Sequence, residues 1–235
     1  FMATHWSPVP GQGRARPAAW LLSLLMALLI GGGGTAGSAP LADRSVVTSA
    51  CEVAYPPFCF VDASGQAQGF SVELLQAALR TMGHTVTFRI GTWPEVRGWL
   101  EQGAVQALPL VGRAPEREQL FDFTFPYMSL HGALVVRKTA RHIHTLDDLR
   151  GGRVGVMRAD NAEEFLRRVP RDFSIVTFST FEEALHQLAH RRLDAVVVQR
   201  LVALRLLRET GLDHELRVVS QPLEDFRQDF CFAVK

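Results

Sequence analysis

From Ser45 onward, short apolar segments alternate with amphipathic ones, and this alternation constrains the fold more than any other feature. The apolar segments have the length and composition of strands, and the amphipathic segments repeat apolar residues at helical spacing. The segments expected to be strands are 45–53, 85–90, 105–111, 132–138, 153–157, 173–178, 193–199, 216–220 and 230–235. Those expected to be helices begin near Ser71, Thr92, Thr145, Ala162 and Phe181, and a last helix ends at Thr210. Alternation twice over predicts an α/β protein of two lobes, with parallel sheets flanked by helices.

The N-terminal region has the order of a secretory signal. Arg14 and Arg16 precede the apolar run at residues 18–30, and small residues follow it up to residue 42. Basic, apolar and small segments in this order are typical of a signal peptide, and the run is short for a membrane-spanning helix. Residues 1–42 are therefore predicted to be a signal peptide or, alternatively, a retained N-terminal anchor. Either places the rest in the periplasm or otherwise outside the cytoplasm, tethered to the membrane if the anchor stays.

Charge and cysteine content narrow the function further. Beyond residue 42 the chain carries 23 Lys and Arg against 24 Asp and Glu, and no basic block remains. Nucleic acid is therefore not an expected partner. Cys51 and Cys59 are close enough in sequence to bridge across a short turn in an oxidising compartment, whereas Cys231 lies in a strand-like run and is expected to be a buried apolar residue.

The segment that ends in Arg117 predicts an anion-binding site. Arg117 follows the predicted strand ending at Val111, and ligands in open α/β sheets bind outside the carboxyl ends of strands. A guanidinium offers a planar fork of donors that matches a carboxylate. The alternative is a solvated arginine that pairs with Glu116 or Glu118 at the surface.

Several motifs occur in a family-specific order. They are YPPF, GFSVELLQAAL, APEREQLFDFTFPY, LDDLRGGRVGV and LDAVVVQ. From about Ser45 to Lys235 the chain resembles the extracytoplasmic solute-binding proteins of family 3. The resemblance implies a type II periplasmic-binding-protein fold with a two-strand hinge, closing over a small ligand. It divides the chain into lobe 1 at 43–128, lobe 2 at 129–226 and a return strand at 227–235, with the C-terminal part of lobe 1 expected to be missing.

The resemblance also assigns residues of lobe 1 to the ligand. The family's carboxylate-binding arginine falls on Arg117. The aromatic residue that stacks on the ligand falls on Tyr55, and the acidic residue just before it is Glu52. The aromatic residue that opens the second helix matches Trp93, and Gly112 stands where the family has a threonine.

In lobe 2 the resemblance is weaker. Asp160 and Asn161 begin a predicted helix, where they either cap it or contact the ligand. Gln199 stands where amino-acid binders of the family place an aspartate for the ligand's ammonium group. The resemblance thus implies a small polar or anionic metabolite rather than a zwitterionic α-amino acid.

Metal, cofactor and catalytic sites are not expected. Glu182, His186 and His190 are spaced for one face of a helix, but that face is predicted to be solvated. Residues 151–155 do not form a dinucleotide-binding fingerprint, because their glycines precede and enter a strand instead of following it.

Three functions remain. The leading interpretation is the sensor domain of a membrane-bound histidine kinase, because LPLVGRAPEREQLFDF and FRQDFCFAVK are most similar to kinase-attached members of the family. The first alternative is a free periplasmic carrier that serves an ABC importer. The second is an enzyme on the same fold, a dehydratase or a transglycosylase-associated protein. The segment itself is expected to bind a ligand and to catalyse nothing.

Overall fold

The computed structural model describes residues 45–170 and 172–235. The predicted signal peptide or anchor at residues 1–42 lies outside these residues. Within the described part of the chain, no helix combines the length and the apolar character needed to cross a membrane.

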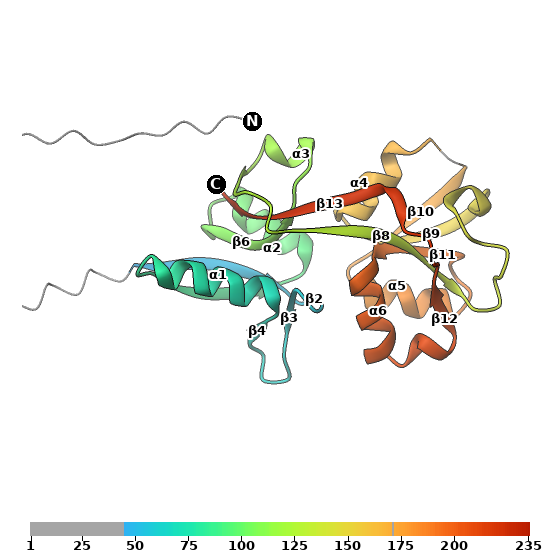
Figure 1. Ribbon diagram of the computed structural model, residues 1–235, viewed down its shortest axis with the longest axis horizontal. Helices are drawn as coiled ribbons and strands as arrows, with labels where there is room; N and C mark the ends of the chain where they lie inside the picture. Colours follow the sequence, from blue (N-terminus) through green and yellow to red (C-terminus); the bar gives the residue numbers. More distant parts are fainter. Residues whose placement is uncertain (1–44, 171) are drawn as a thin grey trace, which may run out of the picture. The chain divides into compact units, whose positions relative to one another are not determined.

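Lobe 1 is built on three parallel strands. β1 (Val46–Glu52) lies between β5 (Thr85–Gly91) and β6 (Ala107–Gly112) and pairs with both in parallel. Parallel neighbours need crossover connections, and α1 (Phe70–Thr81) and α2 (Trp93–Glu101) supply them (Figure 1). The carboxyl ends of β1 and β6 therefore meet at one edge of the sheet.

The start of α1 differs from the prediction. The helix was expected to begin near Ser71, but it begins at Phe70, with Gly69 at the cap position and at φ 114°. A Cβ at Gly69 would lie 2.5 Å from the carbonyl oxygen of Phe58, so the backbone approach there requires glycine. Ser71 instead lies inside the helix, buried, where its hydroxyl accepts a hydrogen bond from Tyr127 at 2.8 Å.

A small antiparallel sheet projects from lobe 1. It consists of β2 (Ala54–Tyr55), β3 (Cys59–Val61) and β4 (Ala67–Gln68). Ser64 and Gly65 lie in the turn between β3 and β4, with Gly65 at φ 78°.

Lobe 2 repeats the strand and helix alternation. Its parallel strands lie in the order β10-β9-β11, and β11 is buried along its whole length. The strands are β9 (Gly152–Met157), β10 (Phe173–Phe178) and β11 (Ala195–Gln199). The helices are α4 (Asn161–Arg168), α5 (Phe181–Ala189) and α6 (Arg200–Glu209). Short elements complete the two lobes: α3 (Pro115–Glu118), β7 (Asp122–Phe123), η1 (Leu146–Leu149), η2 (Leu212–His214) and β12 (Leu216–Val218).

Two long strands cross between the lobes. β8 (Met128–Arg137) pairs with β11, and β13 (Leu223–Val234) pairs first with β8 and then with β6 (Figure 1). This is the predicted two-strand hinge. Both strands and β12 run antiparallel to their partners, so the sheet is mixed rather than purely parallel. An antiparallel pair is expected here because one strand leaves lobe 1 and the other returns to it.

The apolar core continues from lobe 1 into lobe 2. Its buried side chains include Leu110 and Phe230 together with Phe181 of α5. The ring of Tyr55 lies 6.0 Å from that of Phe181 and 6.4 Å from that of Phe230. Tyr55 thus packs at the junction of both lobes and the hinge.

Candidate ligand-binding site

Seven of the eight predicted ligand-binding residues meet at one place. They surround a small cavity of about 10 Å³ together with Leu110 and Phe230. The seven are Glu52, Tyr55, Trp93, Gly112, Arg117, Asp160 and Asn161. They come from the carboxyl ends of β1 and β6, from β2, α2 and α3, and from the start of α4. The topology therefore gathers residues that lie more than a hundred positions apart in the sequence.

Gln199 does not line this cavity. It ends β11, is fully buried, and pairs across the sheet with Gly132 of β8. Neither its amide oxygen nor its amide nitrogen has a hydrogen-bond partner among the described residues.

Arg117 is buried, with 1% of its side chain exposed. Pro115 starts the single turn of α3 and thereby directs Arg117 inward. Glu116 and Glu118 do not pair with Arg117. Glu116 contacts Arg168 at 2.9 Å, and Glu118 contacts Arg113 at 2.5 Å. The solvated-arginine alternative is therefore wrong.

The guanidinium of Arg117 is nearly saturated with hydrogen bonds. Its Nη1 donates to the carbonyl oxygen of Gly112 and its Nη2 to that of Ala159, both at 3.2 Å. Its Nε and Nη2 also approach one carboxylate oxygen of Glu164, at 3.2 and 3.1 Å. The ring of Trp93 faces the guanidinium, with its centroid 5.1 Å away.

Glu164 is a site residue that the sequence did not reveal. An acidic residue in the first turn of a helix such as α4 favours the helix dipole whether or not it has a binding role. The Oε1 of Glu164 accepts from Arg117 and from Arg97, the latter at 3.4 Å, whereas its Oε2 is buried without a hydrogen-bond partner among the described residues. No local sequence signal marks this role, because it depends on α4 facing α3 and α2.

The backbone before α4 links the two lobes. The carbonyl oxygen of Ala159 accepts from the indole nitrogen of Trp93 at 2.6 Å and from Arg117. Ala159 has φ 58°, a left-handed conformation that costs alanine about 1–2 kcal/mol. Its amide donates to Glu163 at 2.6 Å, which holds this turn in place.

The two residues that begin α4 have different surroundings. The carboxylate of Asp160 accepts from the amide of Ala162 at 2.9 Å, so Asp160 caps the helix. Asn161 is also buried, and its side-chain oxygen has no hydrogen-bond partner among the described residues. Asp160 satisfies the capping expectation and lines the cavity as well.

Three carboxylates lie around the buried guanidinium of Arg117. Burial raises the pKa of Asp160 to about 6. Burial also raises the pKa of Glu52 well above its usual value, and the charge of Asp160 raises it further. With Glu164 as the third carboxylate, the surroundings of the cavity carry more acidic than basic groups.

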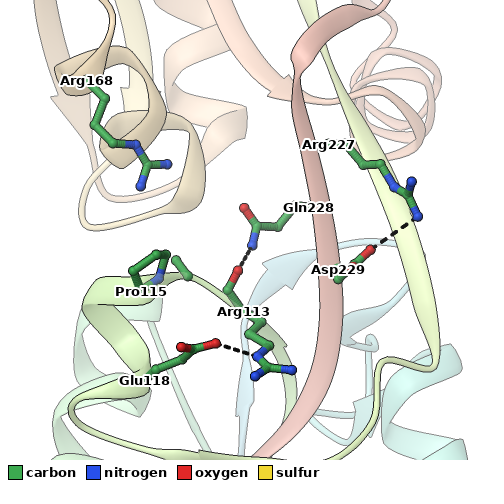
Figure 2. A pocket seen from close by; sticks show the side chains of 8 residues that line it. Arg113, Pro115, Glu118, Arg168, Arg227, Gln228 and Asp229 are labelled. Atoms are coloured by element: carbon green, nitrogen blue, oxygen red, sulfur yellow. Dashed lines mark hydrogen bonds and ion pairs between the residues drawn. The ribbon is translucent and has the colours of Figure 1, made fainter.

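A wider pocket of about 550 Å³ opens beside the site. Figure 2 shows its lining, with Arg113 bonded to Glu118 and Arg227 paired with Asp229 at 3.7 Å. Arg168, the third arginine there, pairs with Glu116. Each of these three arginines therefore already has a carboxylate partner.

The described residues do not bring three or more His, Cys, Asp or Glu side chains together to hold a metal ion. The thiols of Cys51 and Cys59 lie 3.0 Å apart, both buried. Cys231 is a buried free thiol as well.

Solved structures of known proteins have the same architecture. Two solved structures each match 82% of this chain with a TM-score of 0.74. One is an ancestral arginine-binding protein bound to glutamine, at 28% identity and with 84% of its chain covered. The other is a histidine kinase sensor domain with similarity to periplasmic binding proteins, at 30% identity and with 83% covered. The predicted two-lobed type II periplasmic-binding-protein fold is thus confirmed.

Sequence comparison gives the family. The chain is 31% identical over 171 residues to the L-cystine-binding protein TcyJ of Escherichia coli (strain K12). The match covers 72% of this chain but only 64% of that protein, so the chain spans less than two thirds of its relative's length. Residues 47–173 match the family described as bacterial extracellular solute-binding proteins, family 3. The chain belongs to this family of extracellular solute-binding proteins.

Proposed function

We propose that this chain binds a small amino acid outside the cytoplasm, between its two lobes. The observation that carries the proposal is the buried Arg117, held at the carboxyl end of β6 opposite the first turn of α4. A buried fork of N–H donors suits a carboxylate, and the relatives named above bind cystine or glutamine. Closure of the lobes over the ligand is the conformational response that a hinge allows.

The charges of the site favour an ammonium-bearing ligand over an anionic one. The sequence had favoured a polar or anionic metabolite, because Gln199 replaces an aspartate. However, Gln199 does not line the cavity, whereas Asp160 and Glu164 can supply negative charge from other directions. Glu52 favours its neutral form, because burial and the charge of Asp160 raise its pKa well above its usual value. A dicarboxylate would add negative charge beside Asp160 and Glu164, which already share one buried arginine.

The experiment is calorimetric titration of the purified chain with L-cystine, L-arginine and L-glutamine, and with succinate as an anionic control. Binding of at least one amino acid and none of succinate is the expected result. The amino acid that binds should, at 100 times its Kd, raise the free energy of unfolding by about 2.7 kcal/mol. Binding of succinate alone would contradict the proposal.

A carrier role is better supported than a sensor role. The sequence favoured the sensor domain of a histidine kinase, whereas the relatives include binding proteins of ABC transporters, such as a putative arginine-binding protein of Escherichia coli at 29% identity. The histidine kinase sensor domain, at 30% identity, keeps the sensor role as a second candidate. Deleting the gene separates them: loss of uptake of the bound amino acid supports the carrier, and normal uptake with a lost transcriptional response supports the sensor.

A further inference from the structure

The carboxylate of Glu164 occupies the donors that a ligand carboxylate would need. It accepts from both Nε and Nη2 of Arg117, and Nη1 is already bonded to the carbonyl oxygen of Gly112. We propose that Glu164 is an internal carboxylate that competes with the ligand's carboxylate for Arg117 and so sets the affinity of the site. This inference rests on the proposed amino-acid binding.

The cavity beside Arg117 is too small for a ligand unless groups around it move. The cavity beside Arg117 measures about 10 Å³, and a cavity needs about 10–15 Å³ by the same measure to hold a single water molecule. An amino acid therefore fits beside Arg117 only after the lobes have separated or a side chain has moved. Glu164 is the residue to move, because the other groups bonded to the guanidinium are backbone carbonyls.

The bond between Glu164 and Arg117 is one that a ligand can outcompete. The Nε and Nη2 of Arg117 both point to Oε1 of Glu164, while Oε2 of Glu164 is buried without a hydrogen-bond partner among the described residues. A carboxylate that met the guanidinium with both oxygens would make the stronger, bidentate arrangement. A ligand carboxylate that is free to orient itself can adopt that geometry.

Glu164 also has a second cationic partner to retain. Arg97 of α2 lies 3.4 Å from the same Oε1 and is held by Glu101 at 2.8 Å. Arg97 is 21% exposed, so it lies closer to solvent than Arg117. When a ligand takes Arg117, Glu164 can shift to Arg97 without becoming an unpaired buried charge, which would be costly.

Glu164→Gln tests the competition. The amide keeps the size of the side chain but removes the charge, and charge-assisted bonds are about twice as strong as neutral ones. A ligand should therefore displace the glutamine more easily, with affinity about tenfold tighter, the equivalent of about 1.4 kcal/mol. If Glu164 instead held the ligand's ammonium group, the same variant would bind more weakly.

Glu116→Gln is the matched control. Glu116 also pairs across the lobes, with Arg168 at 2.9 Å, but both side chains are about half exposed and neither bonds to Arg117. Its removal should leave the affinity within about twofold, because exposed ion pairs contribute little.

The wild type and both variants are titrated by calorimetry with L-cystine, L-arginine and L-glutamine. Tighter binding in Glu164→Gln alone, or binding by that variant when the wild type binds none, supports competition. An unchanged or weaker affinity in Glu164→Gln, or an equal gain in Glu116→Gln, overturns the inference while the proposed function stands. No binding by any of the three chains overturns the proposed function, and the inference with it.

Discussion

Arg117 has a structural role in addition to its expected role in binding. Its guanidinium is the buried partner of Glu164 and bonds to two carbonyl oxygens from different lobes. If Arg117 only bound the ligand, Arg117→Ala would abolish binding and leave the fold intact. The contacts now lead to a different expectation for stability.

Arg117→Ala should lower the free energy of unfolding by about 1–3 kcal/mol as well as abolish binding, because it removes charge-assisted hydrogen bonds and leaves Glu164 only its more exposed partner Arg97. Adding Glu164→Gln should recover part of that loss, because the charge that needed a partner is gone. Urea unfolding of the single and double variants measures both effects. A single variant as stable as the wild type would mean that the pair contributes nothing.

Asp160 should make stability depend on pH. Burial raises its pKa from the ordinary 3.8 to about 6, while Arg117 lowers it and Glu164 raises it. Because the folded pKa is the higher one, the contribution of Asp160 is fully present below about pH 4 and is lost as pH rises through about 6, up to about 3 kcal/mol. The raised pKa of Glu52 acts in the same direction.

Asp160→Asn isolates this contribution, because asparagine is an equally good helix cap. Between about pH 4 and pH 6 the variant should lose less stability than the wild type, as measured by urea unfolding at several pH values. Identical pH profiles would show that Asp160 does not titrate in this range.

Among the elements, β1 and the β2–β3 hairpin are positioned for a covalent link. The thiols of Cys51 in β1 and Cys59 in β3 lie 3.0 Å apart, and the segment between them carries Glu52 and Tyr55 of the site. We expect a disulfide to form in an oxidising compartment, with the two thiols giving two protons and two electrons to a disulfide-bearing oxidant. Closing so short a loop should add about 2–3 kcal/mol of stability.

Intact mass under non-reducing conditions tests the link. The secreted wild type and Cys231→Ala should each lack two hydrogen atoms relative to their reduced forms. The mass of Cys59→Ser should not show the loss of two hydrogen atoms that an intramolecular disulfide causes. Alkylation of all three cysteines in the denatured, unreduced wild type would rule the disulfide out.

The hinge strands depend on a glycine at their contact. A Cβ at Gly132 of β8 would lie 1.9 Å from the ring of Phe226 in β13, and that ring is stacked on Phe165 at 4.7 Å. Gly132→Ala should therefore destabilise the protein by about 1–3 kcal/mol through overpacking. Gly98→Ala is the control, because its Cβ would have 4.0 Å of space inside α2 and should stabilise the helix by about 0.5–1 kcal/mol. Thermal unfolding of both variants distinguishes crowding from a general effect of alanine.

For the whole molecule, the alternation of strands and helices was sufficient to predict the two lobes and the order of their elements. The position of Arg117 after a strand predicted its place beside the cavity, and the family resemblance predicted that of Trp93. The local pattern was wrong at Ser71, where the close approach of Gly69 to Phe58 decides the helix start. Gln199, which the resemblance assigned to the ligand, lies away from the cavity.

The lobe interface was beyond sequence reasoning for a physical reason. Glu164 and its partner Arg117 are separated by 47 residues, and Arg97 and Glu164 by 67. Their contacts arise only when α2, α3 and α4 pack together. The spacing of apolar residues within one helix does not predict which other helices it will contact. The first turn of α4 has the same favourable acidic pattern whether Glu164 faces solvent or an arginine.

The route of β13 also bears on the order in which the chain can fold. β13 supplies the neighbour of β6, so the sheet of lobe 1 includes a strand from the far end of the sequence. The strands β9, β10 and β11, by contrast, come from one continuous stretch and need no residue before β9 to pair with one another. In a chain that is synthesised or exported from its N-terminus, lobe 1 therefore appears first but completes its sheet last. Until then its apolar strand edge stays open, and a binding chaperone would find its target there.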